Sequence, residues 1–260
     1  MTRLHLYYMY TMGPAASLTI AGTGCPGSFN CSAKEDRTSF DIGYPPTIVS
    51  ILSSFLSCLG SLLIFVVYGV LPKRMRTAVQ KIITLLAVAD LVTALGYLFA
   101  AGNYLSHYNE HAAEKCATFQ VLCEIQSFVT TWSSLCSYTW TNILAIHFYL
   151  KIVRQQTQHR DAKLLPLYNV IAWAGPLLIM VPLLATGKLG FSPYVASNWC
   201  YVKDEDYSTS IKKSPLVIML LLVAGELWVL ITYFVAAGLY FVTSTHLRIQ
   251  VKCVSLSGPA

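Results

Sequence analysis

The chain has 260 residues, of which 55% are hydrophobic and only 12% are charged, and its mean hydropathy is +0.55. Soluble domains carry about 25% charged residues, so this composition excludes an ordinary water-exposed domain. The aromatic content of 12% excludes a disordered coil. The net charge of +6 comes from basic residues scattered between apolar stretches, which excludes the contiguous basic groove of a nucleic-acid-binding protein. A membrane protein fits this composition.

Five apolar stretches are long enough to cross a bilayer, since a spanning helix needs about 20 residues. They exceed the roughly 9 to 11 residues of a barrel strand, and a helix satisfies its own backbone hydrogen bonds in lipid. We therefore predict an all-α fold, a bundle of five transmembrane helices. Pro176 and Pro182 are expected to kink the fourth helix. The spans are expected at residues 47–71, 82–101, 121–150, 164–186 and 215–242.

The charges between the spans predict the orientation, because Lys and Arg accumulate in cytoplasmic loops. With the N-terminus outside, the inner segments carry ten basic residues against the single acid Asp161, whereas the outer segments carry equal numbers of bases and acids. Residues 1–46 are then an extracellular segment, residues 47–242 the bundle and residues 243–260 a cytoplasmic tail. Asn30 begins an Asn-Cys-Ser glycosylation sequence on the extracellular side. We expect a plasma-membrane protein with its N-terminus outside.

The positions of the eight cysteines restrict which of them can form disulfides. Cys58 and Cys136 lie inside predicted spans and Cys253 lies in the reducing cytosol, which leaves Cys25, Cys31, Cys116, Cys123 and Cys200. A bond between Cys123, near the outer end of the third span, and Cys200 would hold the loop before the fifth span over the bundle; the alternative is a free thiol. The sequence has no metal-ligand spacing and no catalytic motif, so we expect no metal, no cofactor and no enzyme activity.

Several short motifs resemble those of G-protein-coupled receptors. Residues 86–91 read Leu-Ala-Val-Ala-Asp-Leu in the second span, and residues 173–177 read Trp-Ala-Gly-Pro-Leu in the fourth. Further motifs are Tyr-Thr-Trp-Thr at 138–141, Leu-Lys-Ile-Val-Arg at 150–154, Gly-Phe at 190–191, Asn-Trp-Cys-Tyr at 198–201 and Glu-Leu-Trp at 226–228. Over residues 47–248 the chain is similar to the slime-mould cyclic-AMP receptors and their animal orphan relatives, a group distantly similar to secretin-type receptors.

This resemblance implies a receptor that transduces an extracellular ligand signal to a heterotrimeric G protein, and it implies the Cys123–Cys200 disulfide. The family has seven spans and this chain stops soon after its fifth, so we expect an incomplete or truncated form. The alternatives are a non-signalling form that retains or modulates the full-length receptor and a small transporter, which the absence of an internal repeat disfavours. The expected partners are the lipid bilayer, the G protein, an unidentified ligand and a second receptor copy, with no nucleic acid.

Polar residues within the spans are the candidate functional residues, because a charge at the centre of a membrane helix costs at least about 2.5 to 3.5 kcal/mol. Asp90 is expected to face other helices, either as a hydrogen-bonded switch or as a packing aid. Glu226 is expected to meet a ligand, to pair with a base such as Lys188 or to form a structural hydrogen bond. At the inner end of the third span, Lys151 and Arg154 are candidates for G-protein contact besides their role in topology. The candidate ligand pocket comprises Glu124, Gln126, Trp199, Glu226 and Trp228.

Overall fold

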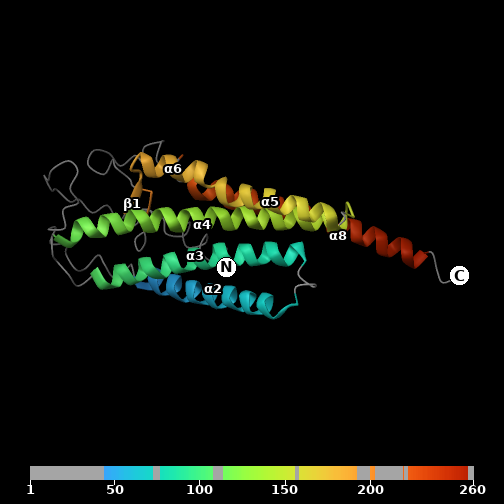
Figure 1. Ribbon diagram of the computed structural model, residues 1–260, viewed down its shortest axis with the longest axis horizontal. Coiled ribbons are helices and arrows are strands. Elements are labelled where there is room, and N and C mark those ends of the chain that lie inside the picture. Colours follow the sequence, from blue (N-terminus) through green and yellow to red (C-terminus); the bar gives the residue numbers. More distant parts are fainter. Residues whose placement is uncertain are drawn as a thin grey trace.

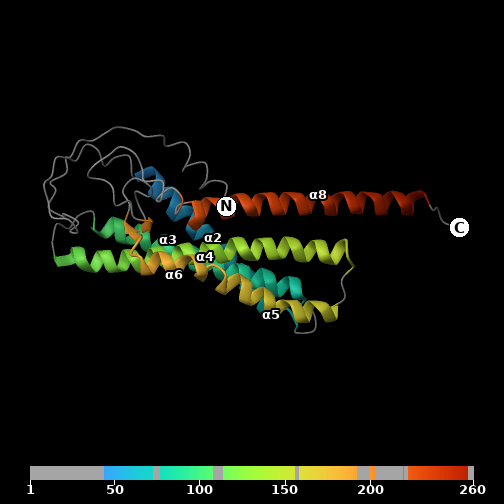
Figure 2. The same cartoon turned by 90° about the horizontal axis from the view of Figure 1, so that it is seen from above.

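The computed structural model describes residues 44–72, 77–107, 114–155, 158–191, 200–202, 219 and 222–256. Helix α4 lies between α3 on one side and α5 with α6 on the other (Figure 1). Helix α8 packs against α4 on a further face (Figure 2). Helix α2 packs against α3. The helices are α2 (Tyr44–Val70), α3 (Ala78–His107), α4 (Glu114–Ile152), α5 (Gln158–Ala174), α6 (Leu177–Ala185) and α8 (Leu227–Leu256).

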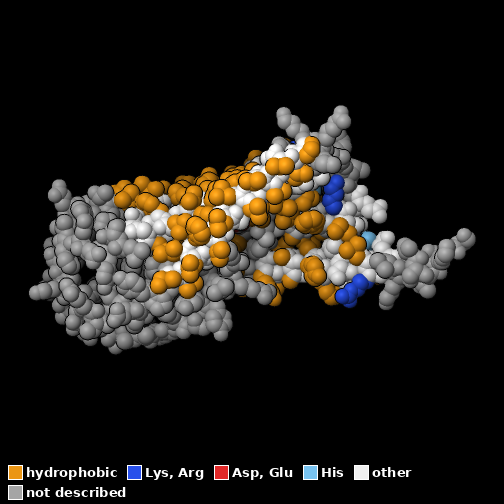
Figure 3. All heavy atoms as spheres, turned by 90° about the horizontal axis from the view of Figure 1, so that it is seen from below, with side chains coloured by type: hydrophobic (Ala, Val, Ile, Leu, Met, Phe, Trp, Pro, Cys, Tyr) orange, Lys and Arg blue, Asp and Glu red, His pale blue; other side chains and the backbone are white. Residues whose placement is uncertain are grey.

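Four helical stretches of the described chain are long and apolar enough to cross a membrane: Ile48–Val70, Ala78–Asn103, Lys163–Ala185 and Leu222–Gln250. Large apolar side chains on α2 and α8 stay exposed, and Figure 3 shows hydrophobic side chains over much of the visible described surface. Apolar surface of this extent is unfavourable in water and matches lipid. The predicted all-α transmembrane bundle is confirmed, and the protein is a multi-pass membrane protein.

The third predicted span, residues 121–150, falls within α4, which is not among those four apolar stretches. α4 contacts α3, α5, α6 and α8. A helix surrounded by other helices can satisfy polar groups with protein partners instead of exposing them to lipid. The polarity of α4 therefore follows from its central place, and its crossing of the membrane stays a prediction. Its buried polar side chains include Gln126, Ser127, Thr130, Thr131 and Ser133.

The fourth predicted span is divided into two helices, α5 and α6, at Gly175 and Pro176. The Gly175 N–H still donates to the Ile171 carbonyl at 3.1 Å, but Pro176 has no N–H with which to continue the ladder. A Cβ on Gly175 would lie only 2.5 Å from the Ile171 oxygen, so the tight turn requires glycine. The predicted kink at Pro176 is therefore a break, whereas Pro182 lies inside α6.

Helix α2 packs against α3 through small residues. Among the residues of α2 whose side chains are described, the buried ones are Ser50, Ser54, Cys58 and Ser61. They recur at one-turn spacing and so form one narrow stripe. Small residues let two membrane helices approach closely, where dispersion contacts and not the hydrophobic effect hold them together. The remaining faces of α2 carry the large apolar side chains that lipid would cover.

Two hydrophobic cores lie along α4. The first includes Ile82, Trp140 and Tyr168, and the second includes Leu135, Met180 and Leu183. Trp132 packs against both cores, and its Nε1–H donates to the Trp173 carbonyl oxygen at 3.2 Å. This bond satisfies the donor of a half-buried indole and joins α4 to the end of α5.

The closest approach of α3 to α4 depends on Gly96. A Cβ at this position would collide with the Thr130 side chain, whereas a Cβ at Gly102 on the same helix would meet nothing within 4 Å. We predict that Gly96→Ala lowers the free energy of unfolding by about 1–3 kcal/mol, the usual cost of overpacking. Gly102→Ala should leave it unchanged or slightly raise it, because alanine favours helix.

Thermal unfolding of the purified protein in detergent, followed by tryptophan fluorescence, measures both variants. Equal unfolding midpoints for Gly96→Ala and Gly102→Ala would contradict the close α3–α4 contact.

Candidate functional site

A short β-hairpin lies over one end of α4. Strand β1 (Leu189–Phe191) pairs antiparallel with β2 (Cys200–Val202), with Gly190 opposite Tyr201. The all-α expectation did not include this hairpin. Leu189 and Val202 are almost fully buried and belong to the second hydrophobic core. We call this end of the bundle the hairpin end.

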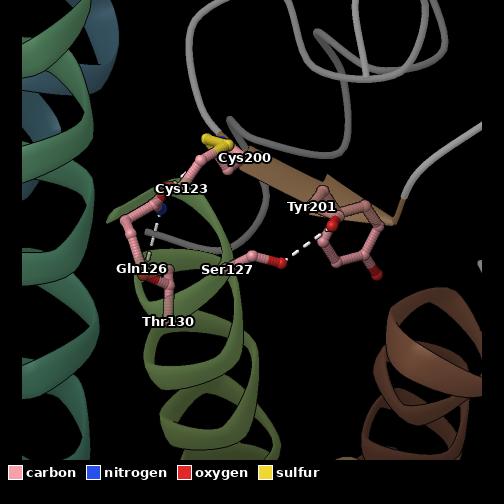
Figure 4. The surroundings of a disulfide bond; sticks show 6 residues. All are labelled: Cys123, Gln126, Ser127, Thr130, Cys200 and Tyr201. Carbon is pink, nitrogen blue, oxygen red and sulfur yellow. Dashed lines mark hydrogen bonds between the residues drawn. A yellow bond between two sulfur atoms is a disulfide. The ribbon is translucent and has the colours of Figure 1, made fainter. Parts of the chain in front are cut away.

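The hairpin is joined to α4 by a disulfide between Cys123 and Cys200 (Figure 4). Their Cα atoms are 5.4 Å apart, within the usual range for a disulfide. Both residues are buried. This is the pairing that the family resemblance implies, and it fixes β2 to the first turns of α4 whose side chains are described.

Two hydrogen bonds from α4 reinforce the disulfide (Figure 4). Gln126 Oε1 accepts from the Cys200 backbone N–H at 3.1 Å, and its Nε2 donates to Thr130 Oγ1 at 3.2 Å. Ser127 Oγ donates to the Tyr201 carbonyl oxygen at 2.8 Å. We call the disulfide and these two bonds to the hairpin the hairpin attachment. Both polar groups of Gln126, an expected pocket residue, are used within the protein.

The Tyr201 ring extends away from α4 (Figure 4). Its hydroxyl reaches the π-helix η3 (Leu222–Glu226), where it would lie 2.5 Å from a Cβ on Gly225. Glycine is therefore needed for this contact. Burial raises the pKa of the Tyr201 hydroxyl, and neighbouring phenols and the Glu226 carboxylate raise it further. The hydroxyl thus stays protonated and available as a donor.

The π-helix η3 leads directly into α8 and ends at Glu226. π-helical turns widen a helix locally and are frequent at functional sites. Trp228 Nε1–H donates to the Val223 carbonyl oxygen at 3.1 Å, which satisfies one carbonyl of the turn. Glu226 is half-buried. The expected contact of Glu226 with a ligand, with a base such as Lys188 or with a structural hydrogen-bond partner stays a prediction.

Asp90 faces α4 in a polar seam between α3 and α4. Ser137 Oγ donates to Asp90 Oδ1 at 2.5 Å, and Thr93 Oγ1 donates to Ser133 Oγ at 2.8 Å. A hydroxyl donor stabilises a carboxyl group that has left water. The prediction that Asp90 faces other helices agrees with this contact, and the contact is compatible with both a switch and a packing role.

Lys151 and Arg154 lie at the other end of α4, which we call the basic end. The neighbouring helices carry three more bases toward the same end: Lys81, Lys163 and Arg248. Figure 3 shows the visible Lys and Arg side chains at this end. Between the two ends, Asn142 Nδ2 on α4 donates to Thr232 Oγ1 on α8 at 3.1 Å. α4 therefore connects the hairpin attachment, the contact with α8 and the basic end.

Of the other residues that the sequence predicted for the site, only some lie in the described part of the chain. Glu124 follows Cys123 and is half-buried, whereas Trp199 and Asn30 lie outside the described residues. The described residues contain no group of three or more His, Cys, Asp or Glu that could hold a metal ion.

Sequence reasoning missed Ser127, and it missed the contact of Tyr201 with Gly225. A signal for Tyr201 was present, since it belongs to a motif of the family resemblance, whereas Gly225 belongs to none of those motifs.

The disulfide predicts a non-additive response to mutation. Cys200→Ser should lower surface delivery and reduce stability by about 2–4 kcal/mol, the usual contribution of a disulfide. Cys123→Ser should cost as much, and the double variant should cost no more than either single one, because all three lack the same bond. Surface labelling and thermal unfolding measure these effects. The matched control is Cys58→Ser, which removes a free thiol on α2; additive losses in the double variant would contradict the bond.

Comparisons with known proteins agree with this architecture. The family model of the slime mold cyclic AMP receptor matches residues 39–254. G-protein coupled receptor 157 of Homo sapiens is 28% identical over 201 residues, which cover 77% of this chain and 54% of that protein. Cyclic AMP receptor 4 of Dictyostelium discoideum is 26% identical over 157 residues, which cover 60% of this chain and 32% of that protein.

The chain spans about half the length of its mammalian relatives, since G-protein coupled receptor 157 of Mus musculus is covered to 55%. The family model, in contrast, covers most of this chain, including every helix and strand described above except the last two residues of α8. The chain therefore belongs to the slime mold cyclic AMP receptor family.

Proposed function

We propose that this protein transduces an extracellular ligand signal to a heterotrimeric G protein. The observation that carries the proposal is the continuous connection through α4, from the hairpin attachment to Lys151 and Arg154. A ligand that contacts the hairpin or η3 acts on groups fixed to both α4 and α8. Basic side chains at the far end suit contact with an acidic surface of the G protein.

The signal requires two helix packings that the ligand binds with different affinity. The α4–α8 interface suits such a change. Asn142 and Thr232 form a side-chain hydrogen bond across it at 3.1 Å, and a bond of this kind contributes only about 0.6 kcal/mol in membrane proteins. A shift of α8 would therefore cost little at this contact. The Tyr201–Gly225 contact at the start of α8 gives the hairpin a direct means of driving that shift.

We further propose that the hairpin end is extracellular, with the N-terminus outside and the protein in the plasma membrane. A disulfide forms in an oxidising compartment, which supports an extracytoplasmic place for Cys123 and Cys200. Basic residues gather toward the opposite end, as the positive-inside rule requires of a cytoplasmic face. Residues 1–46 would then be extracellular and residues 243–260 cytoplasmic.

A second candidate function is association with another receptor copy, which would retain or modulate the full-length form. The exposed apolar faces of α2 and α8 support it, with Phe234 and Tyr240 on α8 exposed by 68% and 76%. Lipid alone can cover such faces, but so can the helices of a second receptor. Co-purification of differently tagged copies from membranes distinguishes the two, because only association yields both tags.

The G-protein proposal predicts a loss of signalling on mutation at the basic end. With the chain reconstituted in nanodiscs beside a G protein, Lys151→Ala with Arg154→Ala should reduce nucleotide exchange at least about fivefold, because charged pairs at an interface contribute roughly 1.5 kcal/mol or more. Lys163→Ala, an exposed base toward the same end, is the matched control and should change the rate less than twofold. The proposal fails if every G-protein class exchanges nucleotide at its unassisted rate.

The topology predicts a glycan at Asn30. Glycosylation reaches only sites exposed to the secretory lumen, so the protein expressed in animal cells should lose apparent mass on glycosidase treatment. Asn30→Gln should show the smaller mass without treatment. An unglycosylated wild-type chain, together with a hairpin that a membrane-impermeant label reaches only in opened cells, would reverse the proposed orientation.

A further inference from the structure

A series of direct contacts runs from α3 through α4 and the hairpin to the start of α8. It begins at Gly96 on α3, where a Cβ would collide with Oγ1 of Thr130 on α4. The same Oγ1 accepts from Gln126 Nε2 at 3.2 Å, and Gln126 Oε1 accepts from the Cys200 N–H at 3.1 Å. Two side chains, Thr130 and Gln126, therefore connect the α3–α4 contact to the hairpin.

Thr130 has little freedom to absorb a movement of α3. It is buried, and a threonine in a helix is stiff, since its branched side chain is confined to two χ1 rotamers. Its Oγ1 lies both against Gly96 and within hydrogen-bond distance of Gln126. A closer approach of α3 would turn the side chain to its other rotamer and carry the hydroxyl away from Gln126. The spacing of α3 and α4 thus decides whether Gln126 keeps this bond.

A second contact between the two helices lies on the same turn of α4. Thr93 Oγ1 donates to Ser133 Oγ at 2.8 Å, and Ser133 Oγ donates to the Thr130 carbonyl oxygen at 3.1 Å. Thr93 lies three residues before Gly96 and so on the same face of α3. α3 therefore contacts the Thr130 side chain directly and the Thr130 backbone through Ser133.

At its other end the hairpin contacts η3. Ser127 Oγ donates to the Tyr201 carbonyl oxygen at 2.8 Å, and the disulfide holds the neighbouring Cys200. The Tyr201 hydroxyl occupies the space that a side chain on Gly225 would need, since a Cβ there would lie 2.5 Å from it. Closely packed groups transmit a displacement, because few voids can absorb it. A shift of β2 should therefore move η3 as well.

We propose that these contacts form a relay that couples the spacing of α3 and α4 to the position of η3 and the start of α8. The relay consists of Gly96, Thr130, Gln126, the strand residues Cys200 and Tyr201, and Gly225. Such a coupling acts in both directions, so a molecule that moves the hairpin would also change the packing of α3. The relay goes beyond the signalling function proposed above, because it adds α3 to the helices that respond and holds whether or not a G protein binds.

The rate at which the Cys123–Cys200 disulfide is reduced measures how firmly the hairpin is held. Both cysteines are buried, so a water-soluble phosphine reaches the bond when the hairpin opens locally. The full chain in nanodiscs is treated with the phosphine, and alkylation of Cys200 is followed by mass spectrometry. Thr130→Val keeps the shape but loses the hydroxyl and should speed reduction about threefold, the equivalent of one side-chain hydrogen bond in a membrane protein. Thr130→Ser keeps the hydroxyl and should stay near the wild-type rate.

A double-mutant cycle tests whether Gly96 acts through Gln126. Gly96→Ala should speed reduction by a similar factor to Thr130→Val, because it displaces the threonine hydroxyl. In a Gln126→Ala background, where the relay is already broken, Gly96→Ala should add nothing. Gly102→Ala is the matched control on α3, since its Cβ meets nothing within 4 Å. Ile82→Val lowers stability in the first hydrophobic core, and it should also leave the reduction rate unchanged.

A second cycle tests the contact with η3. Gly225→Ala should displace the Tyr201 hydroxyl and speed reduction. In a Tyr201→Phe background it should not, because the ring carbon that carried the hydroxyl lies 3.7 Å from the new Cβ, an ordinary contact distance. Hydrogen exchange of the amides of residues 222–226 tests the complete relay. Gly96→Ala should speed this exchange in the wild type and leave it unchanged in Gln126→Ala.

Four results would overturn the relay. They are equal reduction rates for Thr130→Val and Thr130→Ser, equal acceleration by Gly96→Ala with and without Gln126, acceleration by Gly225→Ala that persists in Tyr201→Phe, and exchange in η3 that does not respond to Gly96→Ala. Thermal unfolding verifies that each variant is folded. Because no G protein is present in these measurements, a failure of nucleotide exchange would remove the proposed function and leave the relay intact.

Discussion

The bond between Cys123 and Cys200 is the constraint on which the arrangement at the hairpin end depends. It places β2 beside α4, and only then can Gln126 accept from the Cys200 N–H and Ser127 donate to the Tyr201 carbonyl. These contacts fix the backbone from which the Tyr201 ring reaches η3. Without the disulfide, only these two bonds, the pairing with β1 and the burial of Val202 would hold β2 against the conformational entropy that ordering it costs.

Much of the fold follows from composition alone. The apolar runs of α2, α3 and α8 predict helices because lipid allows few other structures, and the predicted spans overlap the observed helices. The helix ends were less predictable: α2 begins at Tyr44, and α8 continues to Leu256 beyond the expected end at Val242. Backbone hydrogen bonds carry a helix past the point where its side chains cease to be apolar.

The candidate site was predictable only in part. An acid inside an apolar run is conspicuous in any sequence, so Asp90 and Glu226 could be selected from cost alone. The cysteine pair came from the family resemblance. The role of Gly225 could not be foreseen, since a missing side chain matters only once the Tyr201 hydroxyl that occupies its space is known. The bonds of Gln126 were also not predictable. One joins it to Cys200, 74 positions away in the chain, and the other joins it to Thr130 on the next turn of α4.

The polar character of α4 has a consequence for how the protein is made. Ser133 and Ser137 find their partners on α3, at Thr93 and Asp90. A helix that carries so many hydroxyl and amide groups gains little by leaving the translocation channel for lipid by itself. α3 emerges from the ribosome just before α4 and brings those partners with it. For α4, whose crossing of the membrane is a prediction, we therefore expect entry into the bilayer together with α3 during synthesis.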